Sequence, residues 1–119
     1  MFETFNFGQN IKRKFICFDV NPKTPLLQQT DHLYEDMIHI SYSGGYDLDV
    51  GWYPEHNVNG RFVVYVVQAG DWENPMFKYE CKDLDSLHTY LEKCVEFIAT
   101  APKMSDDAIE EQRIRLYGE

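Results

Sequence analysis

The sequence has no apolar run that approaches the ~20 residues needed to cross a bilayer, so we expect no transmembrane segment. Its first residues, Met1 to Gly8, have neither a basic start nor a continuous apolar stretch, so we expect no export signal. Cysteine is scarce, and Cys17, Cys81 and Cys94 are widely spaced among apolar neighbours. These features predict free, buried thiols and a cytoplasmic location, and they argue against a disulfide framework.

Basic side chains are also few. The 119 residues contain 11 Lys and Arg against 20 Asp and Glu, which gives a formal net charge of −9. Between Thr24 and Phe77, eight acids accompany a single base, Arg61. Nucleic-acid-binding proteins collect Lys and Arg to neutralise phosphates, and the only basic cluster here is Lys12 to Lys14. We therefore expect no direct nucleic-acid binding and favour a basic protein partner.

Motifs for catalysis and for cofactors are missing as well. No Ser, Cys or Thr stands in a nucleophile motif, and no glycine pattern matches a phosphate-binding loop. No pair of the four histidines has the spacing of a zinc helix. We predict a non-enzymatic protein with no cofactor and no metal.

What the sequence does contain is enough apolar surface for one packed domain spanning residues 1–119. Hydrophobic residues make up 44% of the chain and aromatic residues 15%. The segment from Tyr46 to Tyr53 alternates strictly between apolar and polar residues, which predicts a strand with one wet face. Arg61 to Ala69 is apolar on both faces and is expected to be a central strand. The five predicted strands are Lys12–Val20, Asp36–Tyr42, Tyr46–Tyr53, Arg61–Ala69 and Met76–Cys81.

Helical spacing replaces this alternation after the last strand. Apolar residues recur at three- and four-residue steps from Leu84 to Ile98, and Asp83 is placed to cap that helix. A second helix begins at Ser105, and with few apolar residues to bury, we expect it to be loosely docked or frayed. The order of elements predicts an α+β fold, with an antiparallel sheet of four to five strands covered on one face by the long helix.

Asp47 and Asp49 project from the same face of one predicted strand, close enough to share a cation or to perturb each other's ionisation. Three interpretations are open: an acidic face that binds a partner, a metal or hydrolytic site that also uses His56, and simple solvation. A hydrolytic metal centre usually needs more ligands than this pair supplies. We therefore favour the partner-binding face.

Aromatic residues beside acids strengthen that interpretation, because Trp and Tyr next to carboxylates are typical of surfaces that bind basic partners. Tyr53 and Trp72 are the expected anchors, whereas Trp52 lies on the apolar side of its strand and is expected in the core. The predicted partner-binding residues are Asp47, Asp49, Tyr53, Glu55, His56, Asp71, Trp72 and Glu73.

Three segments carry a resemblance to a known group of proteins. They are YDLDVGWYPEH from Tyr46 to His56, GDWENP from Gly70 to Pro75, and the helix start DLDSL from Asp83. Together they resemble small bacterial immunity proteins of contact-dependent growth inhibition and related polymorphic toxin systems. The resemblance implies a cytoplasmic antitoxin that binds a cognate toxin domain, often a basic nuclease, and blocks its active site or the approach of its substrate.

The resulting hypothesis is an immunity-type inhibitor whose acidic surface faces a basic toxin. Two alternatives remain: a small metal-binding or hydrolytic domain that uses Asp47, Asp49 and His56, and a non-catalytic adaptor subunit that exposes a sheet edge.

Overall fold

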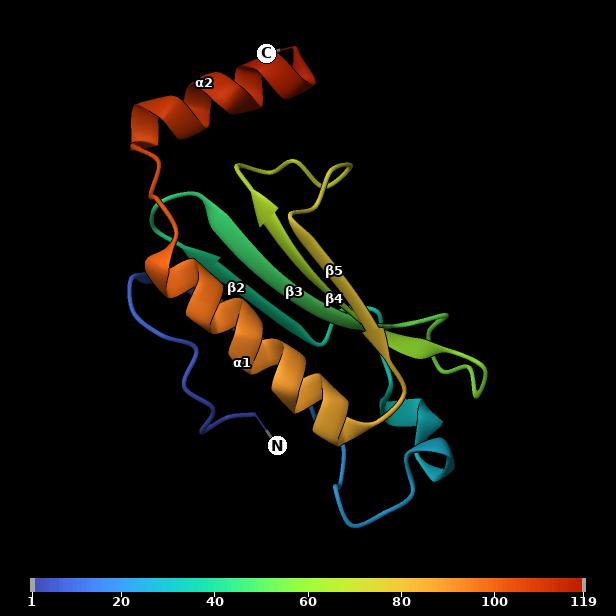
Figure 1. The fold of residues 1–119 in the computed structure, drawn as a ribbon. Helices are drawn as coiled ribbons and strands as arrows, with labels where there is room; N and C mark the ends of the chain where they lie inside the picture. The colour runs from blue at the N-terminus through green and yellow to red at the C-terminus, as the bar shows by residue number, and fades with distance from the viewer. Residues whose placement is uncertain (1, 119) are drawn as a thin grey trace.

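A five-stranded antiparallel sheet forms the centre of the computed structural model, in which residues 2–118 are described. The strands lie side by side in chain order, and two short 3-10 turns, η1 (Leu26–Gln28) and η2 (Thr30–His32), occupy the first connection (Figure 1). The strands are β1 (Ile11–Ile16), β2 (Ile38–Tyr42), β3 (Tyr46–Tyr53), β4 (Arg61–Gln68) and β5 (Phe77–Cys81). Together with two helices after the last strand, this confirms the predicted α+β class.

The predicted strand boundaries agree best with the observed ones where the alternation of apolar and polar residues is strongest. The predicted and observed limits of β3 are the same, and those of β4 and β5 differ by one residue. The first strand is shorter than expected because regular pairing with β2 ends at Ile16, although Phe18 and Val20 are buried beyond it. β4 is an interior strand, between β3 and β5, while β3 is the middle strand of the sheet.

Helix α1 (Leu84–Thr100) lies across one face of the sheet and supplies a second layer (Figure 1). Its apolar stripe belongs to the same core cluster as the inward side chains of β3, including Leu48 and Trp52, neither of which is exposed to solvent. Asp83 caps the helix as predicted, because its carboxylate accepts a hydrogen bond of 2.7 Å from the amide of Ser86. The buried residues of the stripe are Leu87, Leu91, Cys94 and Ile98.

The segment before β1 completes this layer, a role that its sequence did not indicate. Phe2 and Phe7 are only 1% and 2% exposed, and both belong to the core cluster. The hydroxyl of Tyr42 donates a hydrogen bond of 2.6 Å to the carbonyl of Phe7, which ties the segment to β2. The core therefore lies between the sheet on one side and α1 with the first residues on the other.

Helix α2 (Asp106–Tyr117) lies beyond the end of the sheet and buries none of its residues (Figure 1). Hydrogen bonds link this C-terminal region to the sheet, and one of them runs from the Tyr46 hydroxyl to the Pro102 carbonyl at 2.8 Å. The Met104 amide donates to the Gly44 carbonyl at 2.9 Å, the Gln112 side chain donates to the Gln68 carbonyl at 3.3 Å, and the Tyr117 hydroxyl donates to the Gly70 carbonyl. Ile114, Leu116 and Tyr117 remain exposed.

All three cysteines are free thiols, as predicted, but only Cys94 is fully buried. Cys17 and Cys81 are half-buried, so the expectation of burial is wrong for these two. Burial raises the pKa of Cys81 to about 11 and that of Cys94 to about 12, so both thiols are protonated at neutral pH and are poor nucleophiles.

Candidate functional site

The face of the sheet opposite α1 carries most of the polar side chains of the strands, and we call it the open face. Strand register aligns His39 of β2, Asp49 of β3, Tyr65 of β4 and Lys78 of β5 in one row across the sheet. Because side chains alternate along a strand, these residues share one face. The open face includes Arg13, Phe15, His39, Ser41, Asp47, Asp49, Tyr53, Arg61, Val63, Tyr65, Val67, Lys78 and Glu80.

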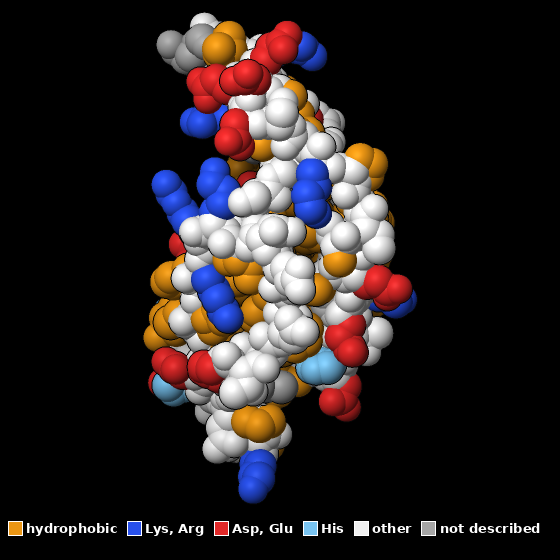
Figure 2. All heavy atoms as spheres, turned by 90° about the vertical axis from the view of Figure 1, so that its left-hand side faces the viewer, with side chains coloured by type: hydrophobic (Ala, Val, Ile, Leu, Met, Phe, Trp, Pro, Cys, Tyr) orange, Lys and Arg blue, Asp and Glu red, His pale blue; other side chains and the backbone are white. Residues whose placement is uncertain are grey.

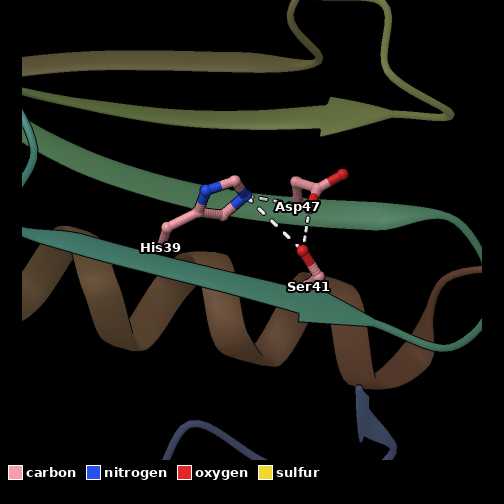
Figure 3. Close-up of polar contacts among 3 residues, drawn as sticks. All are labelled: His39, Ser41 and Asp47. Atoms are coloured by element: carbon pink, nitrogen blue, oxygen red, sulfur yellow. Dashed lines mark hydrogen bonds and ion pairs between the residues drawn. The ribbon is translucent and has the colours of Figure 1, made fainter. Parts of the chain in front are cut away.

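A compact polar cluster joins β2 to β3 on this face (Figure 3). The hydroxyl of Ser41 donates a hydrogen bond of 2.5 Å to Oδ1 of Asp47, and Nε2 of His39 lies 3.1 Å from the same oxygen. The Ser41 hydroxyl lies farther from His39, at 3.5 Å. In a nucleophilic relay the serine proton would be directed to the histidine, whereas here it is directed to the carboxylate. The arrangement therefore orders the Asp47 carboxylate and does not activate Ser41.

Asp49 occupies the centre of the open face, and its surroundings disfavour its charge. Burial raises its pKa to about 6, an effect that His39 opposes and that the nearby carboxylates of Asp36 and Asp47 reinforce. Burial and the same cluster of charges raise the pKa of Tyr53 to about 12, so its hydroxyl remains a hydrogen-bond donor. Negative charges thus lie close together around Asp49 and Tyr53, and they disfavour ionisation of both side chains.

The segment before β2 brings two further acids to this cluster. The Trp52 amide donates a hydrogen bond of 2.7 Å to the Tyr34 carbonyl, which holds the segment against β3. Gly51 permits this approach, because a Cβ atom at that position would lie 1.9 Å from the carbonyl oxygen of Glu35. Asp36 therefore joins Asp47 as a carboxylate that acts on Asp49, and Glu35 lies nearer Tyr53 and Glu55.

Trp72 reaches the open face from the loop between β4 and β5. Its ring packs edge-on against His39, with 5.9 Å between centroids and 89° between planes, yet 43% of the residue remains exposed. Asp71 and Glu73 flank it on the same loop. The structure therefore brings four of the eight predicted residues close to His39 or onto its face, namely Asp47, Asp49, Tyr53 and Trp72. Asp71 and Glu73 are placed only as neighbours of Trp72 on its loop.

Glu55 and His56 lie elsewhere, in the turn after β3, at the opposite end of the sheet from the Trp72 loop (Figure 1). The Glu55 carboxylate accepts a hydrogen bond of 3.0 Å from the Glu35 amide. His56 lies 3.0 Å from the Thr30 carbonyl through Nδ1, so it is fixed to the segment before β2. His56 is thus not assembled with the acid pair, and within residues 2–118 no group of three or more His, Cys, Asp or Glu is placed to hold a metal ion.

Sequence reasoning missed the part that β2 and β4 play in this face. His39 and Ser41 alternate with Ile38 and Ile40, so the pattern marked them as outward-facing, but nothing local placed them opposite Asp49 and Asp47. Tyr65 lies within a strand that is apolar on both faces, and its position opposite Asp49 follows only from the register. The alternation of apolar and polar residues indicated which side chains face outward, but only the strand register showed which of them lie opposite one another.

Comparisons with family models, with curated proteins and with solved structures found no match to this chain. Of the helices in the described residues, none is both long and apolar enough to span a bilayer. The fold and the site thus define an α+β protein with one sheet face packed under a helix and the other face lined by polar, charged and aromatic side chains.

Proposed function

We propose that this protein binds a basic protein partner through the open face, as an immunity-type inhibitor that neutralises a cognate toxin domain. The observation that carries the proposal is the group of three carboxylates, Asp36, Asp47 and Asp49, on the open face, with Trp72, 43% exposed, packed against the neighbouring His39. The proposal also rests on the resemblance of Tyr46 to His56 and of Gly70 to Pro75 to immunity proteins.

Electrostatics explain why a cationic partner suits this surface. The raised pKa of Asp49 reflects burial and the repulsion from Asp36 and Asp47, a cost that a neighbouring lysine or arginine would relieve. A basic toxin side chain placed over Asp49 therefore gains an ion pair and removes an unfavourable interaction already present in the free protein. Charge of opposite sign on the two proteins also accelerates their encounter.

Aromatic side chains supply the apolar part of the contact. Trp72 offers an exposed indole next to His39, and Tyr53 offers a half-buried ring with a protonated hydroxyl. Rigid aromatic side chains beside charged groups commonly dominate the binding energy of protein interfaces. Inhibition would follow from occupation of the toxin's substrate-binding surface, without any chemical step by this chain.

The test uses variants that remove charge with little change of shape. The wild-type protein is used as bait in the native host together with the product of the neighbouring gene, and the recovered partner is then titrated by calorimetry. We expect Asp47→Asn with Asp49→Asn to weaken binding by at least about tenfold and to reduce its dependence on salt. Thermal melting of each variant confirms that it is folded.

The matched control is Glu92→Gln with Glu96→Gln, which removes two exposed charges from α1 on the other side of the sheet. It should leave the affinity unchanged. Equal affinities for the wild type and the open-face variant would show that the partner binds another surface. Recovery of a stable, non-toxic subunit in place of a toxin domain would favour an adaptor role.

A further inference from the structure

A groove of about 360 Å³ lies where α2 meets the end of the sheet, next to the open face. Lys12 and Arg13 of β1 and Arg113 of α2 line it, together with Ser41 and Asp47. The groove is separate from the centre of the open face, where Asp49 and Tyr65 lie. Its lining combines three cations in a protein whose net charge is −9.

Two of these three cations have no ion-pair partner among the described residues. Arg61 lies 3.1 Å from Glu80 and so forms a close ion pair. Within residues 2–118, neither Lys12 nor Arg13 forms an ion pair, and Arg113 has only a contact of 3.6 Å with the exposed Glu110. Figure 2 shows Lys and Arg side chains gathered below the acidic surface of α2. Cations that outnumber the acids around a groove favour a bound anion.

The net charge of the residues that line the groove indicates which kind of anion it binds. Three positive charges and the one negative charge of Asp47 leave a net charge of +2. Oδ1 of Asp47 already accepts a hydrogen bond from Ser41 and lies 3.1 Å from His39, so this oxygen is turned toward β2 partners. A phosphate monoester is a dianion at neutral pH, and guanidinium groups bind its oxygens in a fixed, planar geometry.

The size of the groove indicates how large the ligand is. A volume of about 360 Å³ is at the lower end of the range for small-molecule sites. Gly45 and Gly70 also line the groove, and Ile109 and Tyr117 of α2 pack beside them, which limits the room for a ligand. A long polyanion is disfavoured, because the 20 acids of the chain would repel the phosphates outside the groove.

We propose that the groove between β1 and α2 binds the phosphate group of a small phosphorylated molecule, with Lys12, Arg13 and Arg113 as its ligands. This site adjoins the proposed partner surface and shares Arg13, Ser41 and Asp47 with it, but its phosphate-binding cations are distinct from the carboxylates of the proposed partner surface. It would give the protein a second, small-molecule ligand.

The test measures binding of inorganic phosphate and of glycerol 3-phosphate to the intact protein at low salt. Backbone amide resonances of Ser41, Gly45 and Gly70 should shift on addition of either probe, and titration gives the affinity. We expect Arg13→Gln with Arg113→Gln to weaken binding by at least about tenfold. The control, Lys23→Gln with Lys93→Gln, removes the same charge from exposed positions away from the groove and should change little.

A third variant separates this proposal from the proposed function. Asp47→Asn removes the negative charge from the groove, so phosphate should bind several-fold more tightly, while a basic partner should bind more weakly. Absence of shifts at the groove amides, or equal weakening by the control, would overturn the phosphate site and leave the partner hypothesis unaffected. Tighter binding of an oligothymidylate than of either probe would point to nucleic acid and also overturn it.

Discussion

The two faces of strand β3 have opposite compositions within eight residues. Leu48, Val50 and Trp52 point toward α1 and are fully buried. Asp47 and Asp49 point to the open face, where one is held by hydrogen bonds and the other is crowded by like charge. A single strand thus separates the residues that stabilise the fold from those available for binding, because its side chains alternate with a period of two.

The two faces therefore have opposite effects on the stability of the folded protein. Apolar burial under α1 contributes stability, since each large side chain is removed from water. The open face does the reverse, because it holds carboxylates close together at some expense in stability. Such an expense is typical of sites that gain their compensation from a ligand or a partner.

The largest difference in stability between the two faces is expected for their tryptophans, Trp52 and Trp72. Trp52→Ala should lower the free energy of unfolding by about 3–5 kcal/mol, because it removes a fully buried ring and leaves a cavity. Trp72→Ala should lower it by less than about 1 kcal/mol, since that ring is 43% exposed. Urea denaturation of both variants gives the two values. Similar losses would mean that the open face is as important to stability as the core.

A smaller effect is expected at the centre of the open face. The pKa of Asp49 is raised from its ordinary value of 3.8 to about 6. Between these values the folded protein keeps a proton that the unfolded chain releases, so the stability contribution of Asp49 falls as the pH rises from about 4 to about 6. Asp49→Asn should therefore increase the free energy of unfolding above about pH 6, by about 1–2 kcal/mol after allowance for solvent screening.

Denaturation at about pH 4 and about pH 8 tests this, and the difference between variant and wild type should be near zero at the lower pH. Asp31→Asn is the control, because the Asp31 side chain is 82% exposed. An Asp49→Asn difference that is the same at both pH values would contradict the raised pKa. A loss of stability at high pH would show that the charged carboxylate is favourable.

The smallest stability changes are expected for variants of the helix caps, in α1, which covers the sheet, and in α2, which lies beyond its end. Asp83 and Ser105 cap α1 and α2 through equivalent hydrogen bonds, of 2.7 Å to Ser86 and 3.1 Å to Ala108. Asp83→Ala should cost about 1 kcal/mol of global stability. Ser105→Ala should cost less than about 0.5 kcal/mol globally and should mainly increase amide exchange within α2, which buries no residue. Equal global losses would mean that α2 unfolds together with the core.

The sequence was enough to predict those strands and helices whose formation depends on residues close together in the chain. The alternation from Tyr46 to Tyr53 defined β3, because it depends only on neighbours two positions apart. The spacing of leucines and the Asp83 cap likewise defined α1. The end of β1 at Ile16 was missed, because apolar residues continue beyond it and are buried without strand pairing.

The candidate site depended on contacts between distant parts of the chain. The sequence determined that Asp47 and Asp49 share a face and that the chain is acidic, since both follow from composition and alternation. Only the tertiary structure placed His39 and Asp36 beside Asp49, folded Trp72 back over His39 and separated His56 from the acid pair. The physical reason is that strand register and loop packing join residues far apart in sequence, and no local pattern encodes which partners meet.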